Sequence, residues 1–200
     1  MTTEEQILQA ATKIFTEKGF AAARMDEIAK EAGINRALLH YYFRSKDKMF
    51  EIIFEEKFRN FFAGIYGILS SEMPILEKIA AVVEHELQML VQHPEIPIFI
   101  LNEINVNPER MISRVNREDA SIPEAVKMLD AQIQKEFEQG LIKKIGGFSL
   151  VLEIMSLCIY PFVAKNLIMG VMGMDREAFL QFVLNRKQEI IGILQNGIKQ

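Results

Sequence analysis

Residues 33–50 read GINRALLHYYFRSKDKMF, and this stretch decides how the N-terminal part of the chain is interpreted. It gathers four cations in a chain of 200 residues whose formal net charge is −4: Arg36, Arg44, Lys46 and Lys48. His40, Tyr41 and Tyr42 stand side by side among them. A local concentration of cations and polar aromatic side chains in an acidic protein indicates a surface with its own partner.

The spacing within this stretch predicts a turn followed by a short helix. Gly33 permits a tight turn, and Asn35 is a suitable N-cap for a helix over about 36–43. Ser45 is a suitable cap for the helix that follows. Each of these residue types supplies what a helix boundary needs, so we expect two helix starts within eleven residues.

The short helix over 36–43 has one apolar side and one polar side. Leu39 and Phe43 are four residues apart and should face the core. Arg36, His40 and Tyr41 fall on other faces of the helix. We therefore expect these three side chains to be presented to a partner or to solvent.

Two helices are predicted before this stretch. The first runs from about Thr3 to Lys18, with a capping-box spacing from Thr2 to Glu5 and Gly19 as its stop. Its core face is expected to contain Ile7, Ala11, Ile14 and Phe15. The second covers roughly 25–32, with Ile28, Ala29 and Ala32 pointing inward.

Two short helices joined by a glycine turn, with cations on the second, fit a helix-turn-helix. Arg36 could reach a guanine edge or a phosphate, and His40 and Tyr41 lie one turn further on. Lys46 and the free N–H groups at the start of the next helix would attract a phosphate. The alternative is a solvated basic face on an ordinary helical bundle, and the pattern by itself leaves both interpretations open.

Three segments resemble the DNA-binding domain of the TetR family of bacterial transcriptional repressors: ILQAATKIFTEKGF at 7–20, DEIAKEAGI at 26–34 and LLHYYFRSKDKMF at 38–50. The resemblance implies a three-helix helix-turn-helix domain that binds double-stranded DNA. It implies DNA contacts at Met25, Asn35, Arg36, Ala37, His40, Tyr41, Tyr42 and Lys46. Three positions depart from the family pattern. Arg24 stands where a Thr or Ser usually caps the second helix, Leu38 where a polar residue is common, and His40 where an aromatic residue usually begins the family's aromatic run.

The charge is unevenly divided along the chain. Residues 1–50 hold 8 Lys/Arg and 7 Asp/Glu, a net +1, and the remaining 150 hold 15 and 20, a net −5. The overall acidity therefore does not exclude a nucleic-acid partner, because a local basic face is what such binding requires.

Helical spacing continues through the rest of the chain. We expect helices over about 46–70, 74–92, 95–106, 122–139, 147–170 and 175–198, with a loop over 107–121. The fold class is all-α, with about nine helices. We place a DNA-binding domain at 1–46 and a helical domain for effector binding and dimerisation at 47–200, as the resemblance implies.

Two sets of residues are candidates for functions of the second domain. For a pocket that binds a small, largely apolar effector they are Glu86, Met89, Phe99, Asn102, Met128, Met155, Cys158 and Phe162. Methionine suits adaptable pockets and ordinary cores equally well. For a homodimer interface between the last two helices they are Leu150, Ile154, Leu157, Pro161, Phe179, Phe182, Val183, Ile190, Ile193 and Leu194. The alternative for this second set is a core within the chain.

Other classes of protein receive less support. No nucleophile and base pair, phosphate-binding glycine loop or metal-ligand spacing is evident, so we expect neither an enzyme nor a cofactor. His85 should lie on a solvated helix face and Cys158 should be buried and inert. The apolar run from Phe148 is broken by Glu153, Lys165 and Pro161, which favours an interface helix over a membrane span.

The resemblance implies a ligand-responsive transcriptional regulator. It would be a homodimeric repressor that releases a palindromic operator when its effector binds. The N-terminus has no basic segment leading into an apolar run, so we expect a cytoplasmic protein. The rivals are a helical protein-interaction module that uses its apolar C-terminal half, and a DNA-binding activator or a regulator without a ligand.

Overall fold

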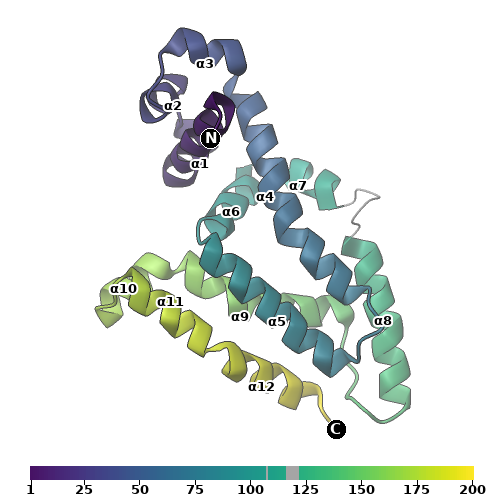
Figure 1. Ribbon diagram of the computed structural model, residues 1–200. Helices are drawn as coiled ribbons and strands as arrows, with labels where there is room; N and C mark the ends of the chain where they lie inside the picture. The colour runs from purple at the N-terminus through teal and green to yellow at the C-terminus, as the bar shows by residue number, and fades with distance from the viewer. Residues whose placement is uncertain (107, 116–121) are drawn as a thin grey trace. The chain divides into compact units, whose positions relative to one another are not determined.

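The computed structural model describes residues 1–106, 108–115 and 122–200. Within these residues the chain is helical apart from turns and one isolated bridge between Ile142 and Lys199. This confirms the all-α prediction. The helices are α1 (Thr3–Ala22), α2 (Met25–Glu31), α3 (Arg36–Tyr42), α4 (Lys46–Leu69), α5 (Ile75–Gln92), α6 (Ile96–Val106), α7 (Pro108–Val115), α8 (Ile122–Glu138), α9 (Gly147–Val163), α10 (Lys165–Met172), α11 (Arg176–Asn185) and α12 (Lys187–Ile198) (Figure 1).

The helix starts agree closely with the capping pattern of the sequence. Thr2 and Glu5 form the expected capping box, in which each side chain accepts a hydrogen bond from the other residue's backbone N–H. The helical conformation of α1 is interrupted at Gly19, where φ is +75°. The Lys48 N–H donates to Ser45 Oγ at 3.2 Å, so Ser45 caps α4 as expected.

Four helix predictions differ from the structure. Helix α1 continues past the interruption at Gly19 to Ala22, whereas Lys18 was its predicted end. Residues 108–115 form α7, where a loop was expected; Pro108 occupies the first helical position, at which a missing N–H costs nothing. The remaining residues of that expected loop, 107 and 116–121, lie outside the described residues. The helix predicted over 147–170 is divided into α9 and α10, which are bent by 62° after Pro161. The helix predicted over 175–198 is divided at Arg186 into α11 and α12.

The chain forms two compact units. The first contains residues 1–60 and 98–108, and the second contains 61–97 and 109–200. Helix α4 contributes to both, because residues 46–60 belong to the first unit and 61–69 to the second.

Aromatic packing forms the core of the first unit. Phe50 of α4 is the centre, since its ring lies 5.3 Å from that of Phe15 and 4.7 Å from that of Phe20. It also lies 5.3 Å from Phe99 of α6 and 5.8 Å from Phe54 on its own helix. Edge and offset ring contacts of this kind stabilise a core beyond the area they bury. They fix α1 and α6 on the start of α4.

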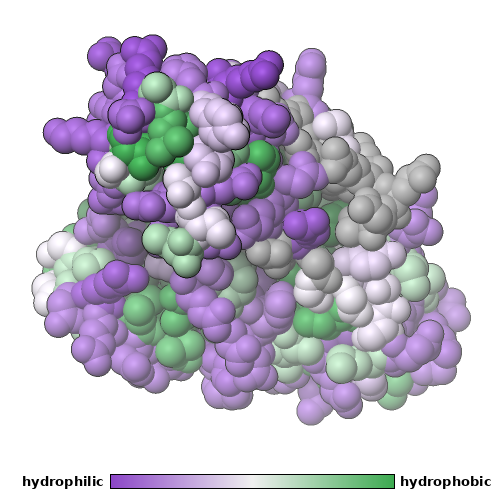
Figure 2. All heavy atoms as spheres, turned by 45° about the horizontal axis from the view of Figure 1, so that its top comes forward, coloured by the Kyte–Doolittle hydropathy of each residue, from purple (hydrophilic) through white to green (hydrophobic). Residues whose placement is uncertain are grey.

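In the second unit α5 packs against α9 and α12, and α8 packs against α9 (Figure 1). Buried polar groups also hold this unit together. The Lys78 ammonium donates to the Leu69 carbonyl and to Gln132, each at 2.6 Å, and the Glu136 carboxylate accepts from the Ile75 N–H. On the face shown in Figure 2, hydrophilic side chains surround separate apolar patches.

No single helix among the described residues is long and apolar enough to cross a membrane. Helices α9 and α10 reach the required length and composition only as a bent pair.

Candidate functional site

The segment from α2 to α3 is a helix, a tight turn and a second helix. Gly33 adopts a φ of +67°, a conformation that a residue with a side chain rarely takes. The turn is closed by the Gly33 N–H bonding to the Lys30 carbonyl and the Ile34 N–H bonding to the Ala29 carbonyl. Asn35 then caps α3, its side-chain oxygen accepting from the Leu38 N–H at 2.8 Å. The expected helix-turn-helix is therefore present, with the expected turn and cap.

Helix α3 has one buried face and one exposed face. Leu39 is fully buried, and Phe43, just beyond the helix, is 2% exposed. Tyr41 is 80% exposed, and Arg36 and His40 are also exposed. The same 3.6-residue period that buries Leu39 turns the polar side chains away from the core. Asn35, Ala37 and Tyr42 are also exposed, and Met25 at the start of α2 is half-buried.

The exposed face contains groups that donate and accept hydrogen bonds. The Arg36 guanidinium lies 3.3 Å from the Asp26 carboxylate, and its Nε donates to His40 Nε2 at 3.4 Å. Both members of the Arg36–Asp26 pair are about two-thirds exposed, so water and salt screen the pair. The rings of Tyr41 and Tyr42 meet edge to face at 5.4 Å. Because the ion pair with Asp26 is weak, Arg36 can exchange it for a stronger hydrogen-bond acceptor with little loss of free energy.

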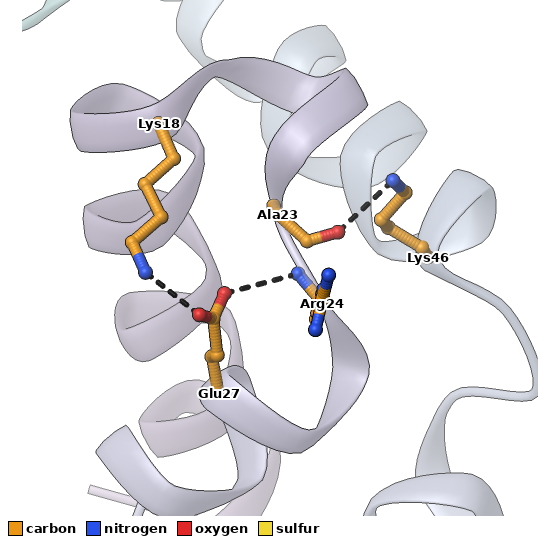
Figure 3. Close-up of polar contacts among 5 residues, drawn as sticks. All are labelled: Lys18, Ala23, Arg24, Glu27 and Lys46. Carbon is orange, nitrogen blue, oxygen red and sulfur yellow. Dashed lines mark hydrogen bonds and ion pairs between the residues drawn. The ribbon is translucent and has the colours of Figure 1, made fainter.

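The start of α2 shows how the chain accommodates Arg24 at a capping position. Arginine has no acceptor with which to cap a helix, but Glu27 accepts from the Arg24 N–H at 3.3 Å (Figure 3). The ammonium of Lys18 lies 2.7 Å from the same carboxylate. This hydrogen bond from Lys18 is the main reason that the pKa of Glu27 is lowered. Glu27 thus supplies the reciprocal half of a capping box, and its ion pair with Lys18 ties α1 to α2.

Lys46 holds the end of α1 from the first position of α4. Its ammonium donates to the carbonyl oxygens of Phe20 at 2.7 Å, Ala21 at 3.3 Å and Ala23 at 3.0 Å (the Ala23 contact is drawn in Figure 3). It also lies 4.4 Å from the centre of the Phe20 ring, a cation–π contact. These three acceptors match the three N–H donors of an ammonium group. A positioning role for Lys46 was not evident from the sequence.

The geometry is that of a short helix carried on a packed core, with its donors and aromatic groups exposed. Such a helix fits the major groove of B-DNA, where side chains reach base edges. The N-terminus of α4 lies one short turn further along the chain, and backbone N–H groups at a helix N-terminus can bind phosphate.

The comparisons with known proteins agree with this geometry. Residues 7–53 match the family described as bacterial regulatory proteins, tetR family. Residues 7–53 therefore form a DNA-binding domain of the kind found in the TetR family. The match and the similar curated proteins indicate DNA-binding regulation of transcription.

Individual relatives differ in function. The transcriptional repressor NicS of Pseudomonas putida is 28% identical over 163 residues, 79% of this chain and 74% of its own length. The transcriptional activator FasR of Mycolicibacterium smegmatis is 32% identical over 79 residues, 40% of this chain and 36% of its own length. The ketosteroid regulator KstR2 of Mycobacterium tuberculosis has the same fold, with a TM-score of 0.69 at 18% identity, over all of this chain and 96% of its own.

The candidate pocket residues do not all lie together in the structure. Glu86 and Met89 of α5 and Cys158 and Phe162 of α9 are buried in the second unit, and Met155 is half-buried there. Two others belong to the first unit, where Phe99 is part of the aromatic core and Asn102 is exposed. Met128 belongs to the second unit but is exposed on α8.

Most candidate interface residues are buried within the chain itself. The buried ones belong to the subunit's own core: Leu150, Ile154, Pro161, Phe179, Val183, Ile190 and Leu194. Leu157 and Phe182 are half-buried, and Ile193 is exposed. The apolar surface on α9 comes from neighbouring positions, since Phe148, Leu152 and Tyr160 are exposed.

His85 is not on a solvated helix face, so that prediction was wrong. Its ring packs directly against Gly64 of α4, at a place where any added Cβ would collide with it. Its Nε2 atom is buried without a hydrogen-bond partner. The glycine at position 64 was the only sequence feature that could have indicated this close approach. Cys158 is buried as expected, and burial is the main reason that its pKa is raised.

Proposed function

We propose that this protein is a homodimeric repressor that binds a palindromic operator through α3 and releases it when a small, largely apolar effector binds. The observation that carries the DNA-reading part is the exposed polar face of α3, held in place by the Gly33 turn and the Asn35 cap. We propose that DNA binding resides in residues 1–46, that the effector and the partner subunit bind within 47–200, and that the protein acts in the cytoplasm.

Arg36, His40 and Tyr41 are the proposed base-reading residues. They lie on the exposed side of α3 and combine donors, acceptors and an apolar ring edge. Bidentate pairing of Arg36 with guanine would replace its screened contact with Asp26. Flanking contacts are assigned to Met25, Asn35, Ala37, Tyr42 and Lys46. A phosphate contact by Lys46 would require its ammonium to give up one of its three carbonyl acceptors.

The proposed homodimer uses the apolar surface of α9. Phe148, Leu152 and Tyr160 are exposed at helical spacing on one side of that helix. The interface would also include the solvent-exposed parts of three further side chains, those of Leu157, Phe182 and Ile193. A twofold interface would set two copies of α3 one DNA turn apart, which matches a palindromic site.

The proposed response to effector runs through α4, which contributes residues to both compact units. A ligand that binds more tightly to one orientation of α4 would shift the dimer between two conformations that differ in the distance between their α3 helices. If the ligand favours the conformation whose α3 helices fit the operator poorly, the protein releases DNA and the ligand is an inducer.

An activator is the second candidate, since one similar protein is the activator FasR. The exposed apolar side chains of α9 equally fit a protein-interaction module. That alternative predicts no preference for a DNA sequence.

The test is selection from a random duplex library at near-physiological salt, using the full chain. The expected result is an enriched palindrome with half-sites one helical turn apart. Binding that is sensitive to salt but indifferent to sequence would overturn the proposal and favour the interaction module.

A further inference from the structure

The carboxylate of Glu86 has no hydrogen-bond partner in the interior of the second unit. Glu86 lies on α5 and is fully buried. Neither Oε1 nor Oε2 accepts a hydrogen bond from any described residue. The Cys158 thiol on α9 lies close enough to lower the pKa of Glu86, but a thiol is a weak donor and does not satisfy either oxygen. Buried side-chain acceptors in folded proteins nearly always have a partner, so this one requires an explanation.

Other buried charges of the same unit are satisfied. Lys78 donates to the Leu69 carbonyl and to Gln132. Glu136 accepts from the Ile75 N–H and from Gln132. The chain therefore pairs buried charges where they serve only to hold its helices together, and Glu86 differs from them.

The surroundings of Glu86 are apolar on its own helix. Val82, Val83, Met89 and Leu90 lie three or four residues away and are all buried. Burial in these surroundings raises the pKa of Glu86 to about 7. The imidazole of the preceding residue, His85, also has a buried nitrogen without a partner. The protein thus holds a carboxylate that is ready to accept a cation but has none in the described residues.

We propose that Glu86 anchors a ligand with one basic nitrogen, an ammonium or amidinium, attached to an apolar body. This inference rests on the proposed effector response and specifies the chemistry of its ligand. A positive nitrogen supplies both the hydrogen bond and the charge that the carboxylate lacks, and the apolar body matches the side chains around it. A bare metal ion fits less well, because the described residues contain no group of three His, Cys, Asp or Glu side chains that could hold one.

The test compares three probes that share an eight-carbon chain, namely octylamine, octanol and octanoate, by calorimetric titration of the full-length protein. Octylamine should bind at least about tenfold more tightly than octanol, and octanoate should bind most weakly. The amine should also displace about half a proton per site at pH 7, measured in buffers of different ionisation enthalpy, because the carboxyl is half-protonated there. Absence of octylamine binding, or tighter binding of octanoate, would overturn the proposal.

Glu86→Gln keeps the shape of the side chain but removes its charge. It should abolish the preference for octylamine over octanol, whereas Glu77→Gln, an exposed position on the same helix, should leave it unchanged. Circular dichroism checks that both variants are folded, and the comparison of the three probes on the parent protein does not depend on either variant. A folded Glu86→Gln variant that still prefers the amine to the same extent would refute the assignment.

Operator binding is measured separately with and without octylamine. If octylamine binds at Glu86 but operator affinity does not change, the proposed amine site stands and the proposed response of DNA binding to the effector is overturned. Failure to bind any operator would overturn the proposed function, while the titration would still decide whether Glu86 holds the amine.

Discussion

Replacing Glu86 by Gln should make the protein more stable at high pH but not at low pH. Glu86 has an ordinary pKa of 4.5 when exposed and one of about 7 in the fold. The native state therefore favours the neutral acid, and stability is lost as pH rises from 4.5 to 7. At 1.36 kcal/mol per pH unit, this loss reaches about 3 kcal/mol. An amide is neutral throughout, so the Glu86→Gln variant avoids the loss.

Urea denaturation of both proteins at pH 5, 6, 7 and 8 measures this difference. Protein concentration is held fixed, because stability of an oligomer depends on it. The free energy of unfolding of the variant, relative to the parent, should rise by about 2.5 kcal/mol between pH 5 and pH 8, and most of the rise should fall below pH 7. Other titrating groups are common to both proteins and cancel in the difference. A relative stability that stays constant with pH would refute the reasoning, because it would mean that burial does not disfavour the charged form of Glu86.

Three further predictions concern the DNA-binding unit and the dimer. Lys46→Met removes the ammonium that binds three carbonyl groups, and it should lower the stability of the fold by about 1–3 kcal/mol in thermal unfolding. Lys48→Met, at an exposed position, should have little effect. Equal unfolding midpoints for the two variants would contradict the positioning role of Lys46. Asn35→Ala should cost about 1 kcal/mol in denaturant unfolding, and Asn35→Ser, which restores a cap, should recover that stability. A Ser variant that is as unstable as the Ala variant would exclude capping as the cause. Tyr160 and Met73 are both exposed, but only Tyr160 lies on α9. Tyr160→Glu should therefore shift the protein toward monomer in analytical ultracentrifugation, whereas Met73→Glu should not. An unchanged sedimentation coefficient for Tyr160→Glu would contradict an interface on α9.

The local features of the DNA-binding unit could be predicted from sequence. The turn at Gly33, the caps at Asn35 and Ser45, and the buried face of α3 all depend on residues within four positions of one another. Spacing and capping rules operate at that range, which is why these predictions were confirmed. The contacts of Lys46 could not be found in this way, because its acceptors lie up to 26 residues earlier in the chain.

The second unit was less predictable for a related reason. An apolar stripe indicates that a helix face is buried but not which surface covers it. Phe179 and Ile190 were expected at a dimer interface, yet the subunit's own core covers both. Phe99 was grouped with Glu86 as a pocket residue, but it packs in the aromatic core of the first unit. The sequence also contains no indication that Glu86 lacks a partner, because that depends on the packing of α5 against α9.

The most direct test of the central claim is the ratio of affinities for the selected operator and for a scrambled duplex of the same length. It is measured at one salt concentration for the parent chain and for Arg36→Ala, Tyr41→Ala and Lys48→Ala. If α3 reads the bases, Arg36→Ala and Tyr41→Ala should each reduce the ratio by a factor that corresponds to about 1–3 kcal/mol of binding free energy. Lys48 belongs to α4 and not to α3, so Lys48→Ala should leave the ratio unchanged. Unchanged ratios for Arg36→Ala and Tyr41→Ala would contradict the claim that the exposed face of α3 recognises the operator.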